Sequence, residues 1–107
     1  MNSHYVAILV PEDTGGWTVL FPDMPGCATH GSTVQEAQWM AAEAADLHLT
    51  TMRESGMDAP PPRSLETVRG DAECADGRGI DWSKVVVSLI RPEPISAARE
   101  RYPEEAG

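Results

Sequence analysis

Apolar and polar residues alternate in short blocks along the first thirty residues, a pattern typical of strands joined by tight turns. The runs YVAILV at residues 5–10 and WTVLF at residues 17–21 are rich in β-branched and aromatic side chains. Between them, the segment EDTGG at residues 12–16 supplies the glycines of a tight reversal. The pattern predicts a β-hairpin, followed after the turn PDMPG at residues 22–26 by a short third strand at residues 27–30.

A long helix is predicted from residue 34 to about residue 54, because this stretch contains no glycine or proline and is rich in alanine. Either Ser32 with Gln35 or Thr33 with Glu36 has the spacing of a capping box at its start. Three- and four-residue spacing predicts one buried stripe, which consists of Val34, Ala37, Ala41, Ala44 and His48 and is widened by Met40 and Leu47.

The chain after this helix is predicted to be mostly irregular until one last strand. Residues 56–83 form a polar surface excursion, in which residues 64–69 have room for one or two helical turns. The run KVVVSLI at residues 84–90 is almost continuously apolar, which indicates burial on both faces or a place in the centre of a sheet. The tail at residues 91–107 has room for a short amphipathic helix.

The order strand, strand, strand, helix, excursion, strand predicts an α+β fold in which one long helix packs on a small, mainly antiparallel sheet. The length of 107 residues suits one small domain. We expect that domain to span residues 1–90 and the remaining residues, 91–107, to form a short tail.

The chain is strongly acidic, with 17 acidic against 8 basic residues and a net charge of −9. Such a surface repels nucleic-acid phosphates and suits a basic partner, although solubility alone is an equally good reason for the charge. Cys27 and Cys74 are far apart and lack metal-ligand spacing, so two free thiols are expected. With no apolar stretch long enough to span a membrane and no signal-peptide pattern at residue 1, a cytoplasmic protein is expected.

No arrangement of residues in the sequence points to catalysis. The four predicted strands contain no Asp or Glu, so a two-metal nuclease site has no ligands there. Asp23 is the one acid near a strand end, and in such a turn an Asp more often accepts backbone N–H groups than acts as a base. His4, His30 and His48 are scattered and have no nucleophile in a known motif. We therefore expect no catalytic residue, metal or cofactor.

Trp39 is the most informative aromatic residue, because it lies two residues past Ala37 and so away from the predicted buried stripe. An exposed tryptophan on an acidic helix is a good anchor for a partner protein. The alternative, equally open from the sequence, is that Trp39 packs beneath the excursion at residues 60–80.

The stretch FPDMPGCATHG at residues 21–31, preceded by the strand at residues 5–10 and followed by Glu36-Ala37, resembles the HicB family of antitoxins. This resemblance implies a degraded, partial ribonuclease H-like fold without nuclease activity. It also implies a partner, the small basic toxin HicA, which cleaves messenger RNA and whose active surface the antitoxin covers. Many family members add a C-terminal DNA-binding module, and the residues after Ile90 are too few for a complete one, so DNA binding is not expected.

The sequence thus favours a non-catalytic antitoxin that binds a HicA-type toxin. The residues that we expect to contact the partner are Asp23 and Met24 in the turn and Trp39, Glu43 and Asp46 on the helix. The alternative is a solitary HicB-like regulatory or ligand-binding module without a toxin. In both cases we expect a homodimer or homotetramer, because small antiparallel sheets have edges that can pair.

Overall fold

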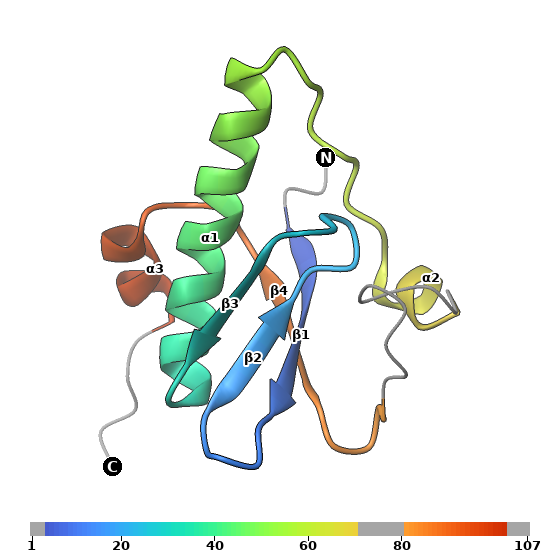
Figure 1. Ribbon diagram of the computed structural model, residues 1–107, viewed down its shortest axis with the longest axis vertical. Helices are drawn as coiled ribbons and strands as arrows, with labels where there is room; N and C mark the ends of the chain where they lie inside the picture. Colours follow the sequence, from blue (N-terminus) through green and yellow to red (C-terminus); the bar gives the residue numbers. More distant parts are fainter. Residues whose placement is uncertain (1–3, 71–80, 103–107) are drawn as a thin grey trace.

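The computed structural model describes residues 4–70 and 81–102, which form a four-stranded antiparallel sheet with helices on both faces (Figure 1). The strands are β1 (Tyr5–Pro11), β2 (Trp17–Leu20), β3 (Ala28–Gly31) and β4 (Val86–Ile90), in the order β3-β2-β1-β4. The helices are α1 (Val34–Glu54), α2 (Leu65–Arg69) and α3 (Ile95–Arg101). The α+β class predicted from the sequence is confirmed.

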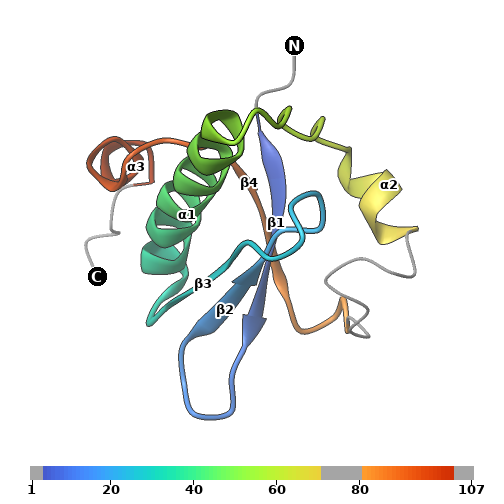
Figure 2. The same ribbon diagram turned by 45° about the horizontal axis from the view of Figure 1, so that its top comes forward.

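Strand β1 lies between β2 and β4 and supplies core residues to both faces of the sheet. Tyr5, Ala7 and Leu9 pack with α1, whereas Val6 and Ile8 point to the opposite face and pack with α2. All five are at most 5% exposed, as the two-residue period of a strand covered on both sides requires. Figure 2 shows α1 and α3 on one side of this strand and α2 on the other.

The predicted hairpin is confirmed, with Leu9 of β1 paired to Val19 of β2. Gly15 and Gly16 have φ values of +96° and +82°, a region that other residues seldom adopt, so the glycines allow the tight reversal. The third strand begins one residue later than predicted, at Ala28.

Helix α1 has the predicted limits but a different buried face. Thr33 is the N-cap and accepts a hydrogen bond from Glu36 N, so the second of the two predicted capping pairs is the one that forms. The fully buried residues are Ala37, Ala41, Ala42 and Ala45. The predicted stripe is therefore correct at Ala37 and Ala41 and wrong at Leu47, which is 59% exposed. Its other members are half-buried: Val34, Met40, Ala44 and His48. The buried face is rotated relative to the predicted one because α1 packs between the sheet and the segment that carries α3. Glu93 N, just before α3, donates a hydrogen bond to Ala42 O.

Strand β4 is an edge strand, so its predicted place in the centre of the sheet is wrong. Burial on both faces is nevertheless largely correct. Ile90 packs into the core beneath α1, and Val85 and Val87 pack against the cluster around α2. An edge strand can be this apolar because helices cover both of its faces; Leu89, at 55% exposure, is the exception.

Residues 64–69 do not belong to a surface excursion, which corrects the sequence-based interpretation. Ser64 caps α2 by accepting a hydrogen bond from Thr67 N, and Val68 is fully buried against Val6 and Ile8. The short helix therefore closes the second face of the sheet. Residues 71–80 of the predicted excursion lie outside the described residues.

The residues after β4 fold back onto α1 and form the short helix expected there. Glu93 N donates to Ala42 O, and the buried Glu93 carboxylate pairs with Arg101 at 2.6 Å. The Tyr102 hydroxyl donates to Leu89 O at 2.9 Å. Helix α3 is thus attached both to α1 and to the edge strand β4. Within the described parts of the chain, none of the helices has the length and apolar character to cross a membrane.

Candidate functional site

The loop between β2 and β3 directs its two predicted contact residues into the protein. Two backbone hydrogen bonds fold this loop, from Met24 N to Phe21 O and from Cys27 N to Met24 O, both at 3.0 Å. Asp23 is 9% exposed and Met24 is 1% exposed. Neither side chain therefore offers a partner more than a small area in this conformation, and the exposed residues of the loop are Pro25 and Gly26.

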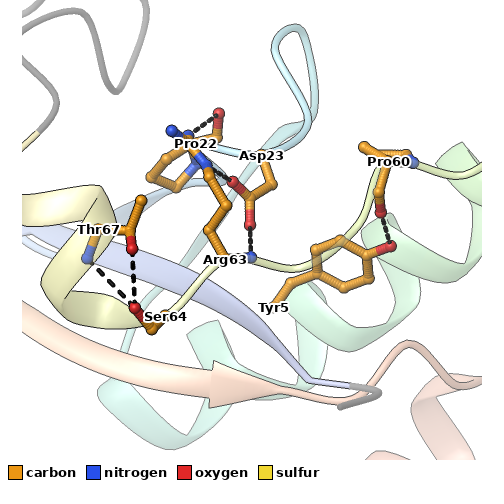
Figure 3. A network of polar contacts seen from close by, with 7 residues as sticks. All are labelled: Tyr5, Pro22, Asp23, Pro60, Arg63, Ser64 and Thr67. Carbon is orange, nitrogen blue, oxygen red and sulfur yellow. Dashed lines mark hydrogen bonds and ion pairs between the residues drawn. The ribbon is translucent and has the colours of Figure 1, made fainter. Parts of the chain in front are cut away.

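Asp23 is clasped by Arg63, forty residues along the chain (Figure 3). Arg63 N donates to Asp23 Oδ2 at 2.8 Å, and its Nε pairs with Asp23 Oδ1. Arg63 Nη2 also reaches Pro22 O at 3.4 Å. The sequence correctly predicts that Asp23 accepts a backbone N–H, but nothing in it indicated the donor or the ion pair, because both come from a distant segment.

The clasp belongs to a strap, residues 57–64, that connects α1 to α2. The Tyr5 hydroxyl donates to Pro60 O in the middle of this strap, and Ser64 at its end begins α2 (Figure 3). Burial, followed by the negative charge of Asp23, raises the pKa of Tyr5 above its ordinary value. The strap thus fixes the β2–β3 loop and α2 relative to β1.

Trp39 packs beneath α3 and is half-buried, so both predictions for its surroundings need correction. Its indole Nε1 donates to Tyr102 O, and the Arg99 guanidinium lies 5.0 Å from the ring centroid. The residues that cover Trp39 therefore come from the C-terminal segment and not from the excursion at residues 60–80. Direct contact between this indole and a partner would require a partner that also touches α3.

Glu43 and Asp46 are the two predicted contact residues that are not engaged by the fold. They are three residues apart on α1, so their side chains are neighbours on its surface. Within the described residues, neither carboxylate takes part in an ion pair. Both are half-buried. The five predicted contact residues therefore lie in different surroundings. Asp23 is paired with Arg63, Met24 lies in the core and Trp39 contacts the C-terminal segment. Glu43 and Asp46 form no ion pair among the described residues.

The described residues contain no cluster of three or more His, Cys, Asp or Glu side chains able to hold a metal ion. Burial raises the pKa of the Cys27 thiol to about 11, so it is protonated at neutral pH and a poor nucleophile.

Solved structures of antitoxins share this fold. The chain of the "HicA3 and HicB3 toxin-antitoxin complex" aligns with a TM-score of 0.64 and 21% identity, over 85% of this chain and 99% of that one. A "Toxin-Antitoxin complex from Streptococcus pneumoniae" aligns with a TM-score of 0.67 and 22% identity, over 97% of this chain and 75% of that one. The N-terminal domain of the Burkholderia pseudomallei antitoxin HicB gives a TM-score of 0.64 at 23% identity, over 81% and 94% of the two chains.

Sequence comparison identifies one related protein and one matching protein family. An uncharacterized 14.9 kDa protein from the rep-hol intergenic region of Haemophilus phage HP1 is 32% identical over 69 residues, which are 64% of this chain. The match spans about half the length of that phage protein, 52%. The family model described as "HicB_like antitoxin of bacterial toxin-antitoxin system" matches residues 5–101, from the first strand to the last residue of α3. The chain belongs to the HicB-like antitoxin family of bacterial toxin–antitoxin systems.

Proposed function

We propose that this chain neutralises a small basic HicA-type toxin by binding it and covering the surface with which the toxin engages messenger RNA. The observation that carries the proposal is the family match over residues 5–101, which leaves no described element outside the family pattern. The solved relatives named as toxin–antitoxin complexes support a toxin as the class of partner.

Charge supplies the physical basis for this choice of partner. The net charge of −9 attracts a basic protein over the Debye length of roughly 8 Å at physiological salt and accelerates its encounter. Covering the RNA-binding surface of the toxin requires affinity and a large enough contact area, and it requires no catalytic reaction by this chain. Strands that carry no Asp or Glu are compatible with such a role.

The predicted contact residues take different parts in this proposal. Glu43 and Asp46 are free on the surface of α1, and we assign them to direct contact with basic side chains of the toxin. Asp23 and Met24 shape the loop from inside, and Trp39 positions α3. We keep a homodimer or homotetramer as the expected assembly, to be measured by light scattering.

The test is a calorimetric titration of the purified chain with a HicA-type protein encoded in the same genome, at about 0.15 M salt. We expect saturable binding with a Kd below about 1 μM. Reversing both charges, in E43K/D46K, is expected to slow association and weaken binding at least tenfold, because rim charges act mainly on the encounter. The matched control is E12K/D13K, which also reverses two exposed carboxylates, in the turn between β1 and β2, and keeps the wild-type affinity.

The proposal is wrong if the wild-type chain does not bind such a toxin. A stable oligomer that neither binds a HicA-type protein nor protects RNA from it would favour the alternative, a solitary regulatory module. Equal loss of affinity in E43K/D46K and E12K/D13K, which change the net charge by the same amount, would instead indicate a general effect of net charge, and the assignment of Glu43 and Asp46 would be withdrawn.

A further inference from the structure

A groove of about 310 Å³ separates the outer side of α1 from the loop that leads into β3. Helix α1 contributes Ala44, Leu47, His48 and Thr51, and the loop and first residue of β3 contribute Gly26, Cys27 and Ala28. Three of these residues are glycine or alanine, whose small size leaves the space between helix and loop unfilled. The groove lies along α1 beside the face that the helix buries against the sheet, and Ala44 borders both.

Leu47 is the most exposed large apolar side chain among the described residues, at 59%, and it forms one wall of this groove. A single exposed leucine is common on protein surfaces. Here, however, it stands beside a shallow hollow lined by small residues together with His48 and Thr51. The leucine and the hollow together form a place where an apolar side chain of another molecule would bury part of its surface.

The charges around the groove decide what kind of molecule fits. Glu43 precedes Leu47 by four residues and Glu54 follows Thr51 by three, so both carboxylates lie on the same side of the helix as the groove. Arg53, by contrast, lies six residues beyond Leu47 and therefore on another side of the helix. A second copy of this chain would bring the same carboxylates against each other, which disfavours self-association at this surface. The groove suits a partner segment in which an apolar residue is flanked by basic ones.

We propose that this groove, walled by Leu47, is the place where the basic toxin inserts an apolar side chain, with its neighbouring basic residues at Glu43 and Glu54. The inference rests on the proposed function and adds the location of the contact. It also changes the site expected from the sequence. The groove is formed by α1 and by the end of the loop nearest β3, whereas Asp23 and Met24, which the sequence predicted as contacts, are buried elsewhere in the loop.

The direct test compares L47D with L89D in toxin binding. The two leucines have similar exposure, 59% and 55%, but Leu89 lies on strand β4, away from the groove. Neither residue is in the core, so both variants should fold as the wild type does. Loss of a buried leucine contact predicts that L47D binds roughly ten- to a hundredfold more weakly, whereas L89D binds normally.

A second experiment locates the toxin-contact surface by cysteine alkylation and does not depend on comparing affinities. In a C74S background, T51C places a thiol on the groove wall and E66C places one on α2; both parent positions are exposed. Saturating toxin should slow alkylation at position 51 at least tenfold and leave position 66 unchanged. The native Cys27 thiol is buried and has a raised pKa, so it contributes little background.

The outcomes separate the inference from the function on which it rests. Normal toxin binding by L47D, or unhindered alkylation at position 51 in the complex, would overturn the groove as the contact while the antitoxin role stood. Failure of the wild-type chain to bind any HicA-type protein would overturn both.

Discussion

Individual residues show most clearly why the motif at residues 21–31 has its composition. Gly31 ends β3 beside the first turn of α1, and a Cβ on it would overlap the backbone N and Cα of Ala37. Backbone atoms of a helix cannot give way as a flexible side chain can. The glycine therefore permits the close contact between strand and helix on which the packing of α1 depends.

The first prediction concerns this contact. Gly31→Ala should lower the free energy of unfolding by about 1–3 kcal/mol, because the helix must shift to admit a methyl group. The matched control is Gly70→Ala, where a Cβ would lie 3.7 Å from the nearest atoms and φ is −83°. That change should stabilise the protein by about 0.4–1 kcal/mol. Urea unfolding measures both, and equal effects of the two substitutions would contradict the steric account.

The second prediction at this scale is a pH dependence caused by Cys27. Burial raises the pKa of its thiol from 9.0 to about 11, so the unfolded chain releases the proton at lower pH than the folded chain. The free energy of unfolding should therefore fall as the pH rises from about 9 to about 11. Burial also raises the pKa values of Tyr5 and Tyr102 above 10.0, so they act in the same direction at higher pH.

Urea titrations at several alkaline pH values would measure this effect. Cys27→Ala should remove the decline between about pH 9 and about pH 10 and lessen it between about pH 10 and about pH 11, where the part due to the tyrosines remains. An unchanged decline in that variant would show that the thiol does not contribute.

Helices and strands that are determined by nearby residues could be predicted from the sequence. Features that depend on contacts with distant segments of the chain could not. The hairpin, the limits of α1 and the short terminal helix follow from turn residues, caps and composition near each element. The prediction for the buried face of α1 wrongly included Leu47 and left out Ala42 and Ala45, because the alanines allow more than one face to be buried and the position of α3 decides among them. The central position expected for β4 failed because two-sided burial is also possible at an edge that helices cover.

The third structural prediction tests the clasp that joins the strap to the β2–β3 loop. Arg63→Ala leaves the Asp23 carboxylate, 3% exposed, without its cation and should cost about 2–3 kcal/mol of unfolding free energy. Asp23→Asn leaves an arginine that is 33% exposed and can be hydrated, so it should cost about 1–2 kcal/mol. The double variant should cost less than the sum of the two. Strict additivity would mean that the two side chains are not energetically coupled.

At the scale of the whole molecule, the fold holds Asp23 in an ion pair with Arg63 and Glu93 in one with Arg101, whereas Glu43 and Asp46 on α1 take part in no ion pair among the described residues. Family and fold were accessible from the motif at residues 21–31 and are confirmed over residues 5–101. The predicted contact residues were chosen by residue type and by position in a turn or on a helix, which cannot distinguish a carboxylate held by Arg63 from one that is free for a partner. Only the tertiary structure makes that distinction.

We propose that the chain neutralises a toxin by covering its RNA-binding surface. The most direct test of this proposal is to measure RNA cleavage by the HicA-type protein as this chain is added. We predict that cleavage falls linearly and ends when the antitoxin subunits match the toxin molecules in number. The E43K/D46K variant should require a large excess, whereas E12K/D13K, which changes the net charge equally, should behave as the wild type. Cleavage that continues unchanged in the presence of excess wild-type chain would contradict it.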